Sequence, residues 1–164
     1  MRPTAMPRSL GPDLPPSLVE LFDGGDLAGR VGLTFLLLTV DEAGWPHMAM
    51  LSVGELVAEN PRVLRGALWH SSSSTRNLER EKRGVLAFIS DGSAYYVRLR
   101  TSRSPDLELG AEGRLAAFRL DVEDVLEDAV GYARLTSGVS FVLNSPDDVL
   151  ARWRRTIEAL RRGG

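Results

Sequence analysis

LWHSSSSTRNL, residues 68–78, takes the chain from a hydrophobic strand into a cluster of hydroxyl side chains and then into a short helix. The first turn of a helix leaves backbone N–H groups unpaired and carries the positive end of the helix dipole. Hydroxyl groups and the guanidinium of Arg76 at this place would suit a bound phosphate group. The simpler interpretation is that Ser74 or Thr75 caps the helix and that the other serines form a polar loop.

The flanking segments favour the phosphate interpretation. Upstream, Gly44-Trp45-Pro46-His47 makes a turn between two apolar segments, and downstream the strand at residues 85–89 ends at Asp91-Gly92. This order of strands, turn and Ser/Thr-Arg-Asn-Leu helix, over residues 33–143, resembles the FMN-binding split-barrel superfamily, the group of pyridoxamine 5′-phosphate oxidase and flavin reductases. The resemblance depends on the order of the motifs, and it indicates a branch distinct from the oxidase itself.

The resemblance implies that FMN lies in a cleft between the two protomers of a homodimer. The loop and helix start would hold the phosphate, backbone groups of the second strand would meet the edge of the flavin ring, and Trp69 and His70 would line the cleft. The cofactor-binding residues expected on this ground are Ala49, Met50, Leu51, Ser52, Trp69, His70, Ser73, Ser74, Thr75, Arg76 and Asn77. The simpler interpretation makes Met50 and Leu51 core residues, Trp69 a packing residue and His70 a partly exposed loop residue.

Two positions depart from the oxidase. The oxidase holds the phosphate with an arginine three residues after the equivalent of Pro46 and a lysine two residues before the equivalent of Arg76, and these positions are Ala49 and Ser74 here. Losing two cations would weaken phosphate binding, because each charge-assisted hydrogen bond contributes about 1.5–3 kcal/mol. Arg76, together with hydroxyl groups, backbone amides and arginines of the following hairpin, would have to compensate. Related branches that use deazaflavin F420 or bind haem stay open as alternatives, and pyridoxamine 5′-phosphate oxidase activity is not expected.

Composition indicates one domain in an aqueous compartment. The chain has 164 residues, of which 43% are hydrophobic and 26% charged, and this balance suits a single core. The longest apolar run, residues 33–40, is too short to span a bilayer, and the proline-rich start has no apolar core for a signal peptide. No cysteine and only two histidines are present, so we expect no metal site, and a net charge of −2 gives no reason to expect nucleic acid. We therefore expect a cytoplasmic protein without membrane or nucleic-acid partners.

The predicted architecture is mainly β with flanking helices (α+β), a split β-barrel of about six to seven antiparallel strands. Residues 1–16 contain five prolines and are expected to form a flexible arm, followed by a single domain over residues 17–164. Strands are predicted at residues 33–40, 48–53, 63–69, 85–90, 94–101, 114–120 and 133–143, and helices at 17–22, 121–128 and 146–162. The near-continuous apolar sequence of the first strand predicts that both of its faces are covered. In the last helix, Ser145-Pro146-Asp147-Asp148 begins an apolar stripe that includes Trp153 as a packing residue, with arginines such as Arg152 mostly on a solvated face.

The sequence identifies no catalytic residue. No Ser-His-Asp arrangement or pair of carboxylates stands out, but flavin chemistry belongs largely to the cofactor and needs neither. His47 and His70 are candidate proton donors, although structural roles are the simpler interpretation. The leading hypothesis is an FMN-dependent oxidoreductase that transfers hydride between a reduced nicotinamide and a small-molecule substrate. The alternatives are a non-catalytic protein that stores or senses flavin or haem, and an F420-dependent reductase.

Overall fold

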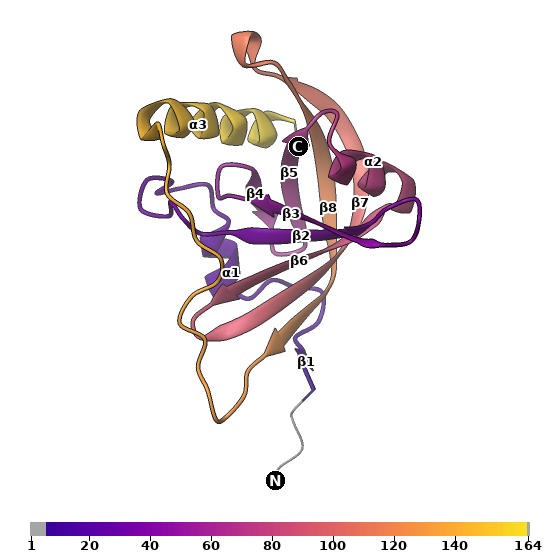
Figure 1. The fold of residues 1–164 in the computed structure, drawn as a ribbon, viewed down its shortest axis with the longest axis vertical. Helices are drawn as coiled ribbons and strands as arrows, with labels where there is room; N and C mark the ends of the chain where they lie inside the picture. Colours follow the sequence, from indigo (N-terminus) through magenta and orange to yellow (C-terminus); the bar gives the residue numbers. More distant parts are fainter. Residues whose placement is uncertain (1–5, 164) are drawn as a thin grey trace.

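A computed structural model describes residues 6–163 and shows an antiparallel sheet of eight strands with three helices around it (Figure 1). The elements are β1 (Arg8–Ser9), α1 (Pro16–Leu21), β2 (Phe35–Val40), β3 (Pro46–Leu51), β4 (Leu56–Asn60), β5 (Val63–Trp69), α2 (Ser73–Glu81), β6 (Arg83–Ser90), β7 (Ser93–Glu108), the short 3₁₀ turn η1 (Gly110–Glu112), β8 (Arg114–Asp128) and α3 (Pro146–Arg162). The mainly β, α+β split barrel is therefore confirmed.

The sheet is open between two strands that follow each other in the sequence. Its strand order is β3-β2-β6-β7-β8-β5-β4, with β1 added to β8. Among residues 6–163, β3 pairs only with β2 and β4 only with β5, so each has one edge whose backbone groups are not used in the sheet. The two edge strands are joined by the turn of residues 52–55, and this turn marks the opening of the barrel.

The core fills the inside of the curved sheet and is closed at one end by α1. Phe22, which follows α1, packs on Phe35 of β2 and Phe88 of β6, with ring centroids 4.9 and 5.5 Å away. The Phe22 carbonyl also accepts a hydrogen bond from the backbone N–H of Ala58 in β4 (2.7 Å). These contacts fix α1 to strands from both halves of the sheet.

β2 is buried on one face only, contrary to the prediction that both faces are covered. Phe35, Leu37 and Thr39 point into the core, whereas Leu36 and Leu38 on the other face are only partly buried and Val40 is exposed. The alternation arises because successive side chains of a strand point to opposite faces of the sheet. The apolar sequence of β2 therefore did not show whether another part of this chain covers its outer face.

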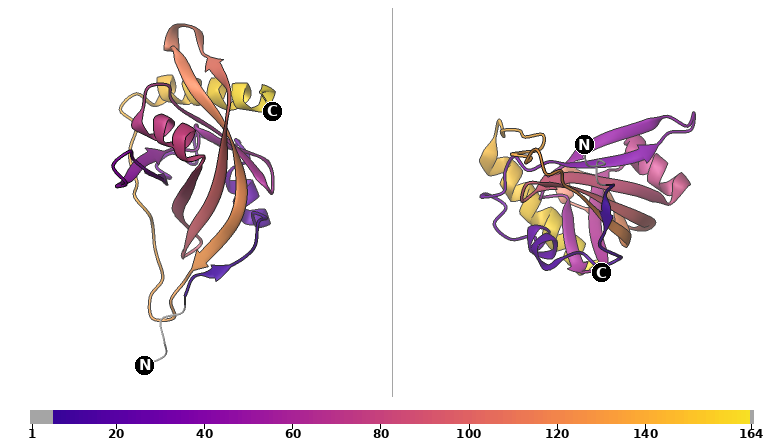
Figure 2. Two further views of the ribbon diagram at one scale, coloured as in Figure 1. Left: turned by 90° about the vertical axis from the view of Figure 1, so that its right-hand side faces the viewer. Right: turned by 90° about the horizontal axis from the view of Figure 1, so that it is seen from below.

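β7 and β8 are much longer than predicted, at 16 and 15 residues, and run the length of the molecule (Figure 2). Residues 105–108 still belong to β7, and the turn η1 at residues 110–112 leads into β8. The helix predicted at residues 121–128 is wrong, because this segment continues β8 and pairs with β7 and β1. Val122 and Val125 are buried there, and the pairing with two neighbouring strands outweighs the local acidic helix-start signal.

The strand predicted at residues 133–143 is also wrong. Residues 129–145 contain no regular element and pass along the outside of the barrel from the end of β8 to α3 (Figure 1). We refer to residues 129–145 as the strap. β4 was not predicted at all, since its five residues are polar at one end and too short to show a periodic pattern.

Part of the expected flexible arm is attached to the barrel. Arg8 and Ser9 pair with Glu127 and Leu126 of β8, and Leu14 is buried. Residues 1–5 of that predicted arm lie outside the described residues. No helix among residues 6–163 is long and apolar enough to cross a membrane.

α3 begins and ends where the sequence predicts and lies across the open side of the barrel (Figure 1). Its buried residues are Trp153, Thr156, Ile157 and Leu160, which confirms the packing role of Trp153. The indole packs directly on the backbone of Gly54, in the turn between β3 and β4. A Cβ atom at Gly54 would lie 1.9 Å from Trp153 Cγ, so only glycine permits this approach.

We expect Gly54→Ala to destabilise the protein by displacing α3, with a loss in free energy of unfolding of about 1–3 kcal/mol, as overpacked cores show. Urea unfolding measures the loss. Gly131→Ala is the matched control, because a Cβ atom at Gly131 would meet nothing within 4 Å. Equal stability of the two variants would contradict the contact.

Candidate functional site

A pocket of about 480 Å³ lies at the opening of the barrel. Its walls come from the end of β3, the turn after it, the strap and α3. The residues that line it are Thr34, Met50, Leu51, Ser52, Glu55, Val139, Ser140, Phe141, Leu143, Val149, Arg152 and Trp153. Most of these side chains are apolar, and two of the five polar ones, Ser52 and Glu55, lie in the turn. An apolar pocket with a small number of placed polar groups is typical of small-molecule sites.

Glu55 is the polar centre of this pocket. Its carboxylate Oε2 accepts hydrogen bonds from the backbone N–H (2.6 Å) and the hydroxyl (2.9 Å) of Ser52, which is itself buried. Burial raises the pKa of the Glu55 carboxyl, and the bonds from Ser52 and the positive charge of Arg152 act in the opposite direction without cancelling it. Glu55 therefore keeps its proton to a higher pH than an ordinary glutamate.

Trp69 reaches the same region from the end of β5. It lines a small depression beside the pocket, and the two cavities share Glu55, Arg152 and Trp153. The guanidinium carbon of Arg152 lies 5.5 Å from the centre of the Trp69 indole, which is 56% exposed. The structure thus gathers four of the predicted cofactor-binding residues in one place, namely Met50, Leu51, Ser52 and Trp69.

The start of α2 is capped by Ser72, rather than by Ser74 or Thr75. The Ser72 hydroxyl accepts a hydrogen bond from the backbone N–H of Thr75 (3.1 Å), and the Thr75 hydroxyl donates to the carbonyl of Trp69 (2.9 Å). Ser74, Thr75 and Asn77 are all buried against the barrel, and the Asn77 amide donates to the hydroxyl of Thr39 in β2 (3.0 Å). These three side chains hold α2 in place.

Ser73 and Arg76 face outward and line a depression with Asp41, Asn77 and Arg80, among others. The Arg76 guanidinium donates to the Ser71 carbonyl (2.9 Å) and the Ser73 hydroxyl (3.2 Å). Among residues 6–163 no carboxylate forms an ion pair with Arg76, so its charge remains available to an anion. This depression is separate from the pocket at the opening of the barrel.

The last two predicted residues occupy neither cavity. Ala49 lies on β3 and packs partly against the core. His70 Nε2 lies 3.1 Å from Asp106 Oδ2 and 3.3 Å from Arg114 Nη2, in an ion-pair network at the β7–β8 hairpin. His70 is thereby tied to that hairpin.

Of the twelve residues that line this pocket, the sequence predicted three as site residues and missed nine, among them Thr34, Glu55 and Arg152. Glu55 gives no sequence signal because it lies in a turn, where a carboxylate is ordinary. Arg152 was assigned to a solvated helix face, but it lines the pocket because α3 lies with that side toward the barrel opening. Only the position of α3 over the turn reveals either role.

The strand order, the opening between β3 and β4 and the helix that covers it define a split β-barrel fold, which solved structures share. A protein of Lactobacillus delbrueckii described as a candidate pyridoxamine 5′-phosphate oxidase has this fold, with a TM-score of 0.55 and 18% identity over 72% of this chain and 98% of that one. A variant of HupZ from Group A Streptococcus gives a TM-score of 0.53 and 12% identity over 70% of this chain and 98% of the other. At these identities the likeness concerns the fold alone.

The chain belongs to the family of the uncharacterised protein YclD of Bacillus subtilis (strain 168). The two sequences are 41% identical over 145 residues, which cover 88% of this chain and 94% of YclD. No family model matches the sequence.

The raised pKa of Glu55 predicts how stability depends on pH. The folded protein binds the Glu55 proton more tightly than the unfolded chain does, so this proton contributes to the free energy of unfolding. The contribution is complete below the unfolded pKa and is lost as pH rises through the higher folded pKa. Glu55→Gln keeps an oxygen acceptor for Ser52 but cannot titrate, so it should remove the loss in free energy of unfolding that accompanies rising pH. Urea unfolding from about pH 4 to pH 8 measures the free energy of unfolding across the range in which a shifted carboxyl titrates.

The control is Glu158→Gln, the same chemical change on an exposed position of α3. The prediction requires that Glu55→Gln flattens the pH profile relative to both the unchanged protein and this control. Parallel profiles for all three proteins would show that Glu55 titrates as an exposed carboxyl does.

Proposed function

We propose that this protein binds FMN and acts as an FMN-dependent oxidoreductase on a small-molecule substrate. The observation that carries the proposal is the pocket at the barrel opening, whose wall includes the edge strand β3. A flavin ring is flat and largely apolar, with carbonyl and N–H groups along one edge. The unused backbone groups of β3 can bond to such an edge, and the apolar side chains of Met50, Leu51 and Val149 can cover its faces.

Bound FMN would supply two-electron chemistry, accepting hydride from a reduced nicotinamide and delivering it to the substrate. The protein's own groups suit that role. Arg152 places a positive charge in the pocket, which would stabilise a ligand that gains electrons. Glu55 can hold a proton on its carboxyl beside the same ligand, since burial raises its pKa.

The start of α2 is the place proposed for the phosphate. Arg76 supplies a cation that forms no ion pair among residues 6–163, although Asp41 and Glu42 line the same depression, and the Ser73 hydroxyl and the start of α2 lie beside it. β3 links the start of α2 to the pocket. His47 of β3 pairs with Thr39 of β2, and Thr39 accepts a hydrogen bond from α2. Met50, which lines the pocket, lies three residues after His47 on the same strand. An elongated ligand that follows β3 would therefore reach both places.

We further propose a homodimer in which a second copy covers the outer face of β2 and β3. This face exposes large apolar side chains, with Met48 52% exposed, Met50 62% and Val40 38%, and Trp45 in the adjoining turn is 71% exposed. Clustered apolar exposure of this kind is typical of interfaces. Met50 belongs to both the face and the pocket, so a partner seated here would also complete the wall of the FMN site.

The test of FMN binding compares FMN with riboflavin, which lacks the phosphate. Equilibrium titration by fluorescence should show FMN binding at micromolar concentration, and Arg76→Ala should weaken FMN about tenfold or more, as expected when a charge-assisted hydrogen bond is lost, with little change for riboflavin. Arg154→Ala, on the exposed side of α3, is the matched control. No binding of FMN would refute the proposal, a Soret band in the purified protein would favour haem, and equal losses for both ligands would show that Arg76 has a structural role.

The dimer is tested by sedimentation at micromolar concentration, where we expect a single species of twice the chain mass. Met48→Glu places a charge in the proposed interface and should shift the protein toward monomer, whereas Ala111→Glu at the tip of the β7–β8 hairpin should not. A monomer in the unchanged protein would refute the interface.

A further inference from the structure

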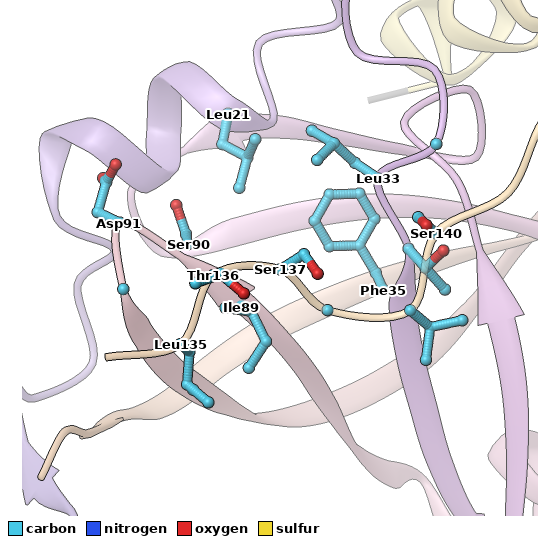
Figure 3. A pocket seen from close by; sticks show the side chains of 15 residues that line it. Leu21, Leu33, Phe35, Ile89, Ser90, Asp91, Leu135, Thr136, Ser137 and Ser140 are labelled. Carbon is cyan, nitrogen blue, oxygen red and sulfur yellow. The ribbon is translucent and has the colours of Figure 1, made fainter. Parts of the chain in front are cut away.

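A second pocket, of about 270 Å³, lies between the barrel and the strap (Figure 3). It is formed by residues 32–35 at the start of β2, residues 89–92 at the turn between β6 and β7, residues 135–140 of the strap, and Leu21 of α1. It adjoins the proposed FMN pocket, because Thr34, Val139 and Ser140 line both cavities. A small molecule held here would be a neighbour of a ligand in the FMN pocket.

The lining of this second pocket has a distinct chemistry. Its polar side chains are hydroxyls, including those of Ser90, Thr136 and Ser137, and its one charged side chain is the carboxylate of Asp91. Among residues 6–163, no arginine, lysine or histidine lines it. Figure 3 shows these groups around the apolar side chains of Leu21 and Phe35. An anionic ligand would meet a carboxylate without a compensating cation, whereas an uncharged or cationic ligand would not.

Some hydrogen-bonding groups in these walls have no partner within the described chain. Thr34 is 8% exposed, and its buried Oγ1 has no hydrogen-bond partner among residues 6–163. A buried hydroxyl without a partner destabilises a folded protein, so such a group calls for an explanation. In the strap, the only backbone hydrogen bond of residues 131–144 within the described chain runs from the Leu135 N–H to the Gly92 carbonyl. The walls thus offer side-chain and backbone partners to a polar ligand.

We propose that this hydroxyl-lined pocket is the substrate site, and that it selects uncharged or cationic small molecules carrying hydroxyl or amide groups over anionic ones. The inference rests on the proposed function, since it places the substrate next to FMN. The volume lies just below the range of about 300–1,000 Å³ that holds drug-sized ligands, so the substrate is a smaller molecule. Thr34 reaches it from the position just before β2, and Asp91 from the β6–β7 turn.

Three probes of one shape and different charge test the selection: nicotinamide (uncharged), 3-(aminomethyl)pyridine (cationic) and nicotinate (anionic). Ligand-observed NMR on the FMN-loaded protein measures the affinity of each. We expect the first two to bind and nicotinate to bind about tenfold or more weakly, because of the unpaired Asp91 carboxylate. Failure of all three probes to bind, or equal binding of nicotinate, would overturn the proposal.

Two isosteric variants locate the probes. Asp91→Asn suits the left-handed turn conformation at φ 49° and should weaken the cationic probe alone. Thr34→Val removes only the unpartnered hydroxyl, so it should weaken nicotinamide while leaving the melting temperature equal or higher. A purely structural Thr34 would instead leave nicotinamide binding unchanged, and an Asp91→Asn variant with unaltered probe affinities would overturn the site.

The FMN affinity is measured on the same samples, which separates the two proposals. If FMN binds and the probes do not show this selection, the substrate site is wrong and the FMN site stands. If FMN does not bind while the probes keep their charge preference in the free protein, the FMN site is wrong and the pocket loses its role beside a flavin.

Discussion

The rest of the structure depends on the sheet being left open between β3 and β4. These edge strands are consecutive and joined by the short turn of residues 52–55, yet among residues 6–163 they do not pair with each other, so the barrel stays open between them. Unpaired strand edges must be covered or paired with something else. α3 covers this opening through the contact of Trp153 with Gly54, and the pocket is the space that remains beside that contact.

The position of α3 also explains why polar and apolar groups meet here. The turn brings Glu55 under the helix, where Ser52 holds its carboxylate, and the helix supplies Arg152 and Trp153 from above. The strap, which leads into α3, forms the far wall and separates this pocket from the one behind Thr34. One geometrical feature, a helix and its preceding segment laid across an open barrel, thus generates both cavities.

The sequence was most informative where local signals and tertiary packing agree. α3 has a capping sequence and an apolar stripe, and the strands at residues 35–40, 63–69 and 83–90 have dense apolar runs, so these elements are confirmed. Residues 121–128 and 133–143 show the limit. The first segment forms a strand because it pairs with β7 and β1, whereas the second lies along the outside of the barrel and pairs with no strand among residues 6–163. In the hydroxyl cluster, the position of β2 decides which side of α2 is buried. A local sequence pattern does not contain that information. Thr75 and Asn77 therefore serve the fold, and Arg76 is left facing outward.

A crystal structure of the protein grown with FMN would show whether a flavin ring binds at the opening between β3 and β4. We predict the isoalloxazine ring against residues 50–52, beneath α3 and near Glu55, with the phosphate at Arg76. A ring bound elsewhere, for example on β7 or β8 away from the opening, would contradict this prediction.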